Sequence, residues 1–176
     1  MAIFYTPIYT QTASGSASTI SFTALPQNFT DLVGVVSGRL LTGGRGDLSV
    51  RFNGDTASSN LYSTTRLYGA GSGGGISDRP YGSSASFGIL SAVQSTETTS
   101  NVFTSVAFWI PNYTANTFKQ IVSDGVVENN ATEAFQLLSA VLYRSTSAIQ
   151  SVSIFSGANF SSLSTFSLYG VTRYGV

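Results

Sequence analysis

The chain has 176 residues, of which 42% are hydrophobic, and this length and composition suit one domain with a packed core and exclude wholesale disorder. Only 9% of the residues are charged, and eight Lys and Arg balance eight Asp and Glu, so the chain lacks the basic surface that binds nucleic acid through its phosphates. Because Cys and His are absent, disulfides, Cys-based metal sites and catalytic dyads that use His are excluded as well.

The N-terminal residues 1–17 differ in pattern from the rest of the chain, and we expect them to form an arm or an edge segment. Pro7 interrupts the run FYTPIYT, and proline is tolerated in an edge strand but not in a central one. The apolar side chains of this run are Phe4, Tyr5, Ile8 and Tyr9. No charge lies near them, so we expect contact with their own domain or with a neighbouring subunit. The segment lacks the basic start of a signal peptide, and no stretch reaches about 18 apolar residues, so we expect no membrane partner.

Residues 18–176 are expected to form a single β-sandwich domain, because apolar and polar residues alternate along many short runs. The clearest runs are residues 19–25, 47–53, 104–110, 136–144, 151–155 and 164–172. Turn sequences such as NGD, PNYTAN and SGANFSS separate them. The best helical candidate, residues 131–142, carries β-branched and aromatic residues between two strand-like runs, which favours a strand. Eight to ten strands of this spacing predict an all-β fold, an antiparallel sandwich or jelly roll.

The alternation also predicts which side chains enter the core. We expect the more apolar face of each run to point inward. The expected core residues are Phe22, Val35, Phe52, Phe108, Leu142, Ile154 and Leu168. Trp109 could serve as a sugar-binding platform, but its place in a strongly strand-like run favours a core position.

The segment RLYGAGSGGGISDRPYG, residues 66–82, is the most glycine-rich part of the chain. A phosphate-binding loop needs a following helix and usually a Lys–Ser/Thr pair, and neither is present. An interdomain linker would separate two different patterns, whereas strand-like runs continue on both sides. We therefore expect residues 69–79 to form an exposed loop between strands. Its glycines are Gly69, Gly71, Gly73, Gly74 and Gly75.

The remaining motifs do not predict an enzyme. Arg45, Gly46 and Asp47 match the integrin-binding tripeptide, but they also fit a glycine-rich hairpin turn before a strand. The eight acidic residues are mostly isolated in loops, so we expect no catalytic carboxylate pair. A calcium ion held by Asp47, Asp55 or Asp124 is an alternative, because calcium needs only oxygen ligands. Otherwise we expect no catalytic residues, no metal and no cofactor.

Three segments in a fixed order resemble a family of phage virion proteins that is frequent in phages of cyanobacteria and marine bacteria. They are SFTALPQNFTDLVGVVSGR at residues 21–39, RFNGDTASSNLYSTTRLYG at residues 51–69 and STFSLYGV at residues 164–171. In that family an opening strand leads to F…LP…TDLV, then FNGDT, LYG with a Gly/Ser loop, and a last strand FSLYG. The resemblance spans most of the chain beyond residue 17 and implies a β-sandwich virion component without enzymatic activity.

Such modules occur in head decoration and in tail fibres or baseplates. Since the chain lacks a repetitive shaft, we expect a capsid decoration (cement) protein on the head shell, organised as a homotrimer. Its partners would be further copies of itself and the major capsid protein or another virion protein, with the N-terminal arm making the contact. The alternative is a tail-fibre or baseplate module that binds host surface glycans through residues 69–80 and nearby tyrosines.

Overall fold

The structure, a computed structural model, describes residues 2–56, 61–71, 75–78, 85–95, 99–128 and 134–174. These residues form strands and connecting turns, with no helix among them, so no helix of the described chain could cross a membrane. The strands are β1 (Ala2–Thr12), β2 (Thr19–Phe22), β3 (Asp31–Gly38), β4 (Gly46–Phe52), β5 (Tyr62–Ala70), β6 (Gly75–Asp78), β7 (Gly88–Val93), β8 (Thr104–Ile110), β9 (Lys119–Glu128), β10 (Ala134–Tyr143), β11 (Val152–Phe155) and β12 (Thr165–Tyr174).

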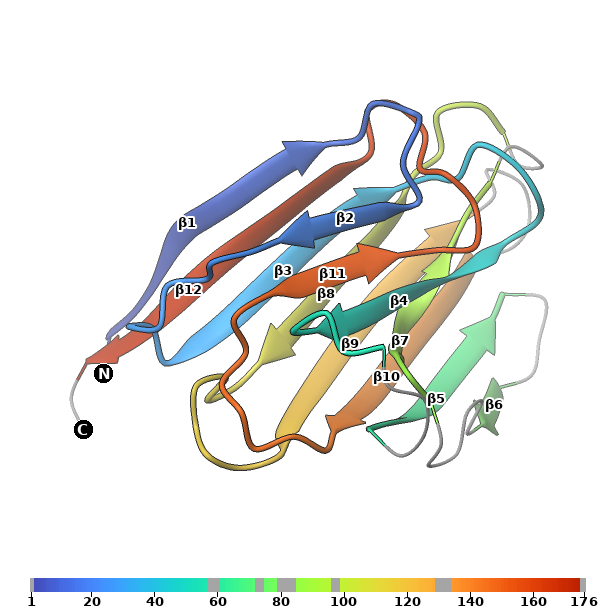
Figure 1. Ribbon diagram of the computed structural model, residues 1–176. Helices are drawn as coiled ribbons and strands as arrows, with labels where there is room; N and C mark the ends of the chain where they lie inside the picture. The colour runs from blue at the N-terminus through green and yellow to red at the C-terminus, as the bar shows by residue number, and fades with distance from the viewer. Residues whose placement is uncertain are drawn as a thin grey trace.

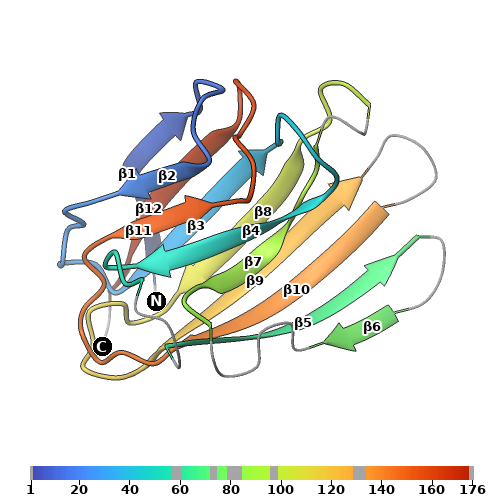
Figure 2. The same cartoon turned by 45° about the vertical axis from the view of Figure 1, so that its right-hand side comes forward.

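The strands form two antiparallel sheets packed face to face. The larger sheet has eight strands in the order β1-β12-β3-β8-β9-β10-β5-β6, and the smaller has four in the order β2-β11-β4-β7. Figure 1 shows the smaller sheet lying across the larger one, with β1 and β6 at the two outer edges. In Figure 2, β5 and β6 extend past the edge of the smaller sheet. The prediction of an all-β sandwich is confirmed.

Eight of the strands have the topology of a jelly roll. The steps from β1 to β2, β3 to β4, β7 to β8 and β11 to β12 each cross from one sheet to the other. The resulting orders, β1-β12-β3-β8 and β2-β11-β4-β7, are those of two interlocked Greek keys. The remaining strands pair as β5-β6 and β9-β10 and widen the first sheet beyond β8. The segment considered as a helix belongs to one of them, since residues 134–142 lie in β10.

The core lies between the sheets, and five of the seven expected core residues point into it. They are Phe22, Phe52, Phe108, Ile154 and Leu168. Aromatic rings fill one end of the core, where Tyr62 stacks on Tyr143 with ring centroids 4.8 Å apart. The Tyr62 hydroxyl accepts a hydrogen bond from the backbone N–H of Phe52 at 2.8 Å, which joins the two sheets.

The expected positions of Val35 and Leu142 are wrong, because both side chains lie on the opposite face of the larger sheet. Val35 is 42% exposed, and Leu142 is half-buried outside the core. In β3 the inward residues include Gly34, which adds nothing to the apolar pattern of that face. In β10 the inward residues include Ser139, while Leu138, Ala140 and Leu142 point outward. Polar and small residues on the inner face therefore made the outer face look like the core face.

The N-terminal residues form an edge strand. β1 pairs antiparallel with β12 from Ala2 to Thr12, and the register shifts at a bulge between Pro7 and Tyr9. A proline and a bulge are devices that limit further pairing at an open sheet edge. Since the backbone of residues 2–12 is hydrogen-bonded to β12 and not extended away from the domain, the arm is part of the sheet.

Part of the glycine-rich segment is a hairpin. Gly69 of β5 pairs with Gly75 of β6, and Gly71 lies in the turn after β5. All three glycines are exposed, as expected, but the loop is shorter than the sequence indicates. Gly73 and Gly74 lie outside the described residues.

Buried tyrosines predict that stability falls in alkaline solution. Burial raises the pKa of Tyr62, Tyr113 and Tyr143 above the ordinary phenol value, and most strongly that of Tyr62. Above about pH 10 the unfolded chain releases phenolic protons that the folded chain keeps, so the free energy of unfolding decreases as the pH rises. Denaturant titrations between neutral pH and about pH 11 measure this loss. Near-ultraviolet absorbance follows the loss of phenolic protons. If all nine tyrosines lose their protons together near pH 10 and the free energy of unfolding does not change, these three tyrosines are not buried.

Candidate functional site

The most unusual surface is the outer face, which we define as the side of the eight-stranded sheet turned away from the four-stranded sheet. In a sandwich this side is normally polar. Here several large apolar side chains are between about two-fifths and half exposed: Val35, Leu67, Val122, Val126 and Leu138. Contiguous apolar surface of this kind marks a binding surface more often than a solvated one.

The strand register places these side chains in rows across the sheet. One row runs Thr65, Ala140, Val122, Trp109, Val33 and Tyr169, from β5 to β12. The next row runs Leu67, Leu138, Asp124, Ala107, Val35 and Ser167. The first row contains no charge, and Asp124 is the only ionisable residue of the second.

A groove of about 490 Å³ lies along the first row, and we call it the Trp109 groove. Its lining residues are Ser63, Thr65, Trp109, Pro111, Gln120, Ile121, Val122, Ala140, Val141 and Leu142. The small side chain of Ala140 lies between Thr65 and Val122 in this row and lines the groove. A second hollow of about 190 Å³ also borders Trp109 and Val122, and the rest of its lining is Val33, Ala107, Phe108 and Asp124.

A buried carboxylate holds Trp109 in place. Asp31 lies at the start of β3 with no exposed surface, and its Oδ2 accepts a hydrogen bond from the indole Nε1–H at 3.1 Å. Its Oδ1 accepts a bond at 2.9 Å from the backbone N–H of Asn112, in the turn after β8. The guanidinium of Arg173 completes the group as an ion pair with Asp31. Three donors thus compensate a charge that would otherwise be costly to bury.

The favoured core position of Trp109 is wrong, since the side chain lies on the outer face and is only partly buried. A signal for this was present in the sequence. If Phe108 points inward, period-two alternation directs Trp109 outward. The ring of Tyr5 meets the indole edge-on, with centroids 6.4 Å apart, which links the groove to the edge strand β1.

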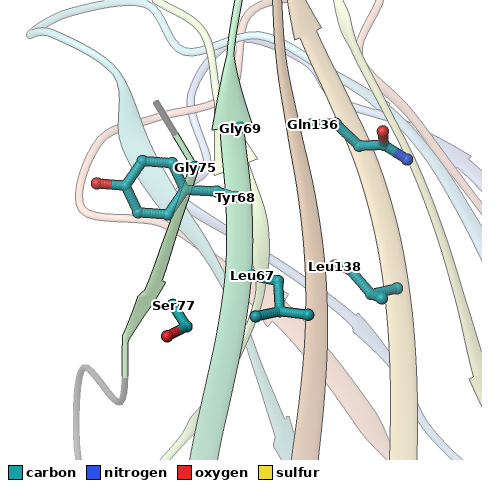
Figure 3. A pocket seen from close by; sticks show the side chains of 7 residues that line it. All are labelled: Leu67, Tyr68, Gly69, Gly75, Ser77, Gln136 and Leu138. Carbon is teal, nitrogen blue, oxygen red and sulfur yellow. The ribbon is translucent and has the colours of Figure 1, made fainter. Parts of the chain in front are cut away.

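A further hollow of about 510 Å³ lies beside the β5–β6 hairpin. Figure 3 shows Leu67 and Leu138 on neighbouring strands, with Gln136 further along β10 and Ser77 on β6. Leu67 and Leu138 are direct cross-strand partners, so they form one apolar pair in the second row. This hollow extends to the β6 edge of the sheet, and the aromatic residue in its lining, Tyr68, packs against the cluster of Ala92, Val127 and Leu137.

The four expected contact residues of the N-terminal segment divide into two pairs. Phe4 is 55% exposed and Tyr5 is 53% exposed. Ile8 packs against the core, and Tyr9 stacks on Phe22 with ring centroids 5.5 Å apart. The Tyr9 hydroxyl donates a hydrogen bond of 2.7 Å to the backbone carbonyl of Thr23. Phe4 and Tyr5 therefore keep about half of their surface accessible to another molecule, although Tyr5 also contacts Trp109, while Ile8 and Tyr9 fasten β1 to its own domain.

The tripeptide at residues 45–47 is engaged within the domain. The guanidinium of Arg45 lies 4.0 Å above the centre of the Phe135 ring, and Asp47 forms a 3.3 Å ion pair with Arg66 of β5. Gly46 begins β4, as expected, but the turn is not a hairpin, because β3 and β4 belong to different sheets. This geometry does not present an extended tripeptide at a loop tip.

The acidic residues considered for calcium are not brought together by the fold. Asp47 lies in the four-stranded sheet beside Arg66, whereas Asp124 lies on β9 and accepts a hydrogen bond from Gln136. Within the described ranges, no three acidic side chains converge on one point.

The only lysine of the chain fills a cage of backbone carbonyls. The Lys119 ammonium is buried and donates hydrogen bonds to the carbonyls of Thr117 at 2.6 Å and Ser147 at 3.0 Å. Two longer bonds reach the carbonyls of Ser145 and Thr146. Burial lowers the pKa of this amine. Lys119 thus joins the start of β9 to the chain after β10 and has a structural role.

No protein-family model, curated protein or solved structure among those compared matches the chain. The resemblance of residues 21–39, 51–69 and 164–171 to phage virion proteins has no support from these comparisons. It enters the proposed function as a hypothesis.

Proposed function

We propose that the chain is a structural component of a bacteriophage virion, a decoration protein that binds the head shell. The observation that carries this proposal is the uncharged edge strand β1, whose Phe4 and Tyr5 remain about half exposed beside an open sheet edge. Pro7 and the bulge limit strand pairing at this edge but leave these apolar side chains exposed, and exposed apolar surface of this kind is typical of a contact with another chain. In a shell, the capsid protein would be that chain.

The composition and the fold support the same proposal. A chain with only 9% charged residues is poorly protected against association, which is acceptable for a subunit of a large assembly. Jelly rolls are common in viral capsids, although they also occur in lectins and enzymes, so this support is an analogy at the level of the fold. A homotrimer would bring several β1 strands to the shell together and convert weak single contacts into avid attachment.

The double variant Phe4→Asp/Tyr5→Asp is expected to fold but to lose attachment. Both side chains are about half exposed, so their replacement removes little packing beyond the contact of Tyr5 with Trp109, and two carboxylates would be buried without partners at the shell. We expect binding to shells that lack the protein to weaken at least about tenfold in a sedimentation assay. Point substitutions are preferable to deletion of residues 2–10, because deletion would strip β12 of its paired strand.

Phe118→Asp is the matched control. Phe118 is as exposed as Phe4 but lies in the turn between β8 and β9. Wild-type attachment by the Phe4/Tyr5 variant, with melting unchanged, would refute the role of β1. Equal losses in both variants would show that added charge, and not the position of the residue, weakens binding.

A further inference from the structure

We propose that the Trp109 groove binds a neutral saccharide, with the sugar ring against the indole and its hydroxyls on Ser63, Thr65 and Gln120. The inference goes beyond the structural role proposed above. It concerns the purified chain and does not depend on where the protein lies in a virion.

The lining of the groove selects against charged ligands. None of its ten residues is titratable, so no charged group in the lining would balance the charge of a phosphate or carboxylate. The volume of about 490 Å³ lies within the range of small-ligand sites, which is about 300–1,000 Å³. The ligand is therefore a neutral molecule of modest size.

Polar groups in the groove select against purely apolar ligands. Ser63 and Gln120 are the cross-strand partners of Leu142, one row away from Thr65, and all three lie on the outer face of β5 and β9. Among the described residues, their side chains form no hydrogen bond within the domain. Each can both donate and accept, which suits sugar hydroxyls, since these have the same capacity. A lipid chain would leave these three groups without partners.

The indole provides a rigid apolar platform. The Asp31 carboxylate and the edge-on ring of Tyr5 fix its orientation before any ligand arrives, so little conformational entropy is lost on binding. A sugar has an apolar ring face and a polar rim, and the groove offers Trp109 and Val122 for the face and Gln120 for the rim.

A protein partner fits the outer face less well. The exposed Asp124 lies in the adjacent row, two residues from Val122 on β9. A second copy packed across this face would bury that carboxylate in the centre of the interface, where charges are costly. A saccharide confined to the groove would leave Asp124 in water.

Trp109 is the only tryptophan of the chain, so its fluorescence reports directly on the groove. We expect one member of a panel of neutral glucose, galactose, mannose and N-acetylglucosamine oligomers to change the emission of the full chain saturably. Calorimetry would then show at least about tenfold weaker binding for Gln120→Ala and no measurable binding for Ala140→Phe, which fills the groove. Thr65→Val, of almost the same shape as threonine, is expected to weaken binding as well.

Gln136→Ala is the matched control, because Gln136 is a glutamine on the same face but outside the groove. The affinity of this variant for the saccharide should stay within about twofold of the wild-type affinity. Thermal melting verifies that each variant folds. The proposal is overturned if no neutral oligomer gives a saturable change, or if Ala140→Phe binds as well as wild type. It is also overturned if a polyproline peptide changes the emission saturably, because the groove would then bind a protein segment.

Discussion

Phe108→Ala is expected to destabilise the fold by about 3–5 kcal/mol, as truncation of a buried phenylalanine usually does. The ring fills the space above Gly34 of β3 so closely that a Cβ atom there would lie 2.0 Å from its Cζ. Alanine would leave a cavity that neighbouring β-strands cannot close, since their spacing is set by backbone hydrogen bonds. Many domains of this size are stable by only about 5–15 kcal/mol, so denaturant unfolding should show an obvious loss.

Val35→Ala is the control for this substitution. Val35 lies one residue from Gly34 but points to the outer face, so its truncation should cost well under about 1 kcal/mol. Equal losses in the two variants would show that the inner and outer faces of β3 and β8 are assigned incorrectly.

Asp31→Ala is expected to cost about 3 kcal/mol and to shift the emission of Trp109 to longer wavelength. The substitution leaves the indole N–H and the Asn112 N–H without their acceptor, and unsatisfied donors in a buried setting are costly. The indole, no longer held, would gain access to water. Denaturant unfolding and fluorescence of the same sample measure both effects.

Asp31→Asn tests the same network more gently, because the amide keeps one acceptor oxygen. The free energy of unfolding should fall less in this variant than in the alanine variant, and the Trp109 emission should stay closer to that of the wild-type chain. If both variants unfold and fluoresce like the wild-type chain, Asp31 does not position Trp109, and the rigid platform in the groove is not maintained by this carboxylate.

The fold could be predicted because alternation over short runs depends only on side-chain direction in a strand. The run at residues 104–110 coincides with β8, and Phe108 is buried as expected. The assignment of faces failed where both faces of a strand are apolar. Leu142 could not be distinguished from Val141 and Tyr143 by pattern, because hydrophobicity is expected on a core face and also on a binding face.

The groove could not be predicted for a related reason. Ser63, Gln120 and Ala140 are far apart in the sequence and become neighbours only through the register of β5, β10 and β9. No sequence spacing encodes that register. The role of Asp31 was equally hidden, since an isolated acid before a strand usually indicates a solvated turn.

We propose that the protein is part of a phage particle, on its head shell. Electron cryomicroscopy of purified virions produced by the genome that encodes the chain would locate it. We expect head-surface density that fits the two-sheet jelly roll, repeated around a three-fold axis, with Phe4 and Tyr5 of β1 against the shell. Density only on tail appendages would contradict the decoration role, and absence of the chain from intact particles would contradict the virion assignment itself.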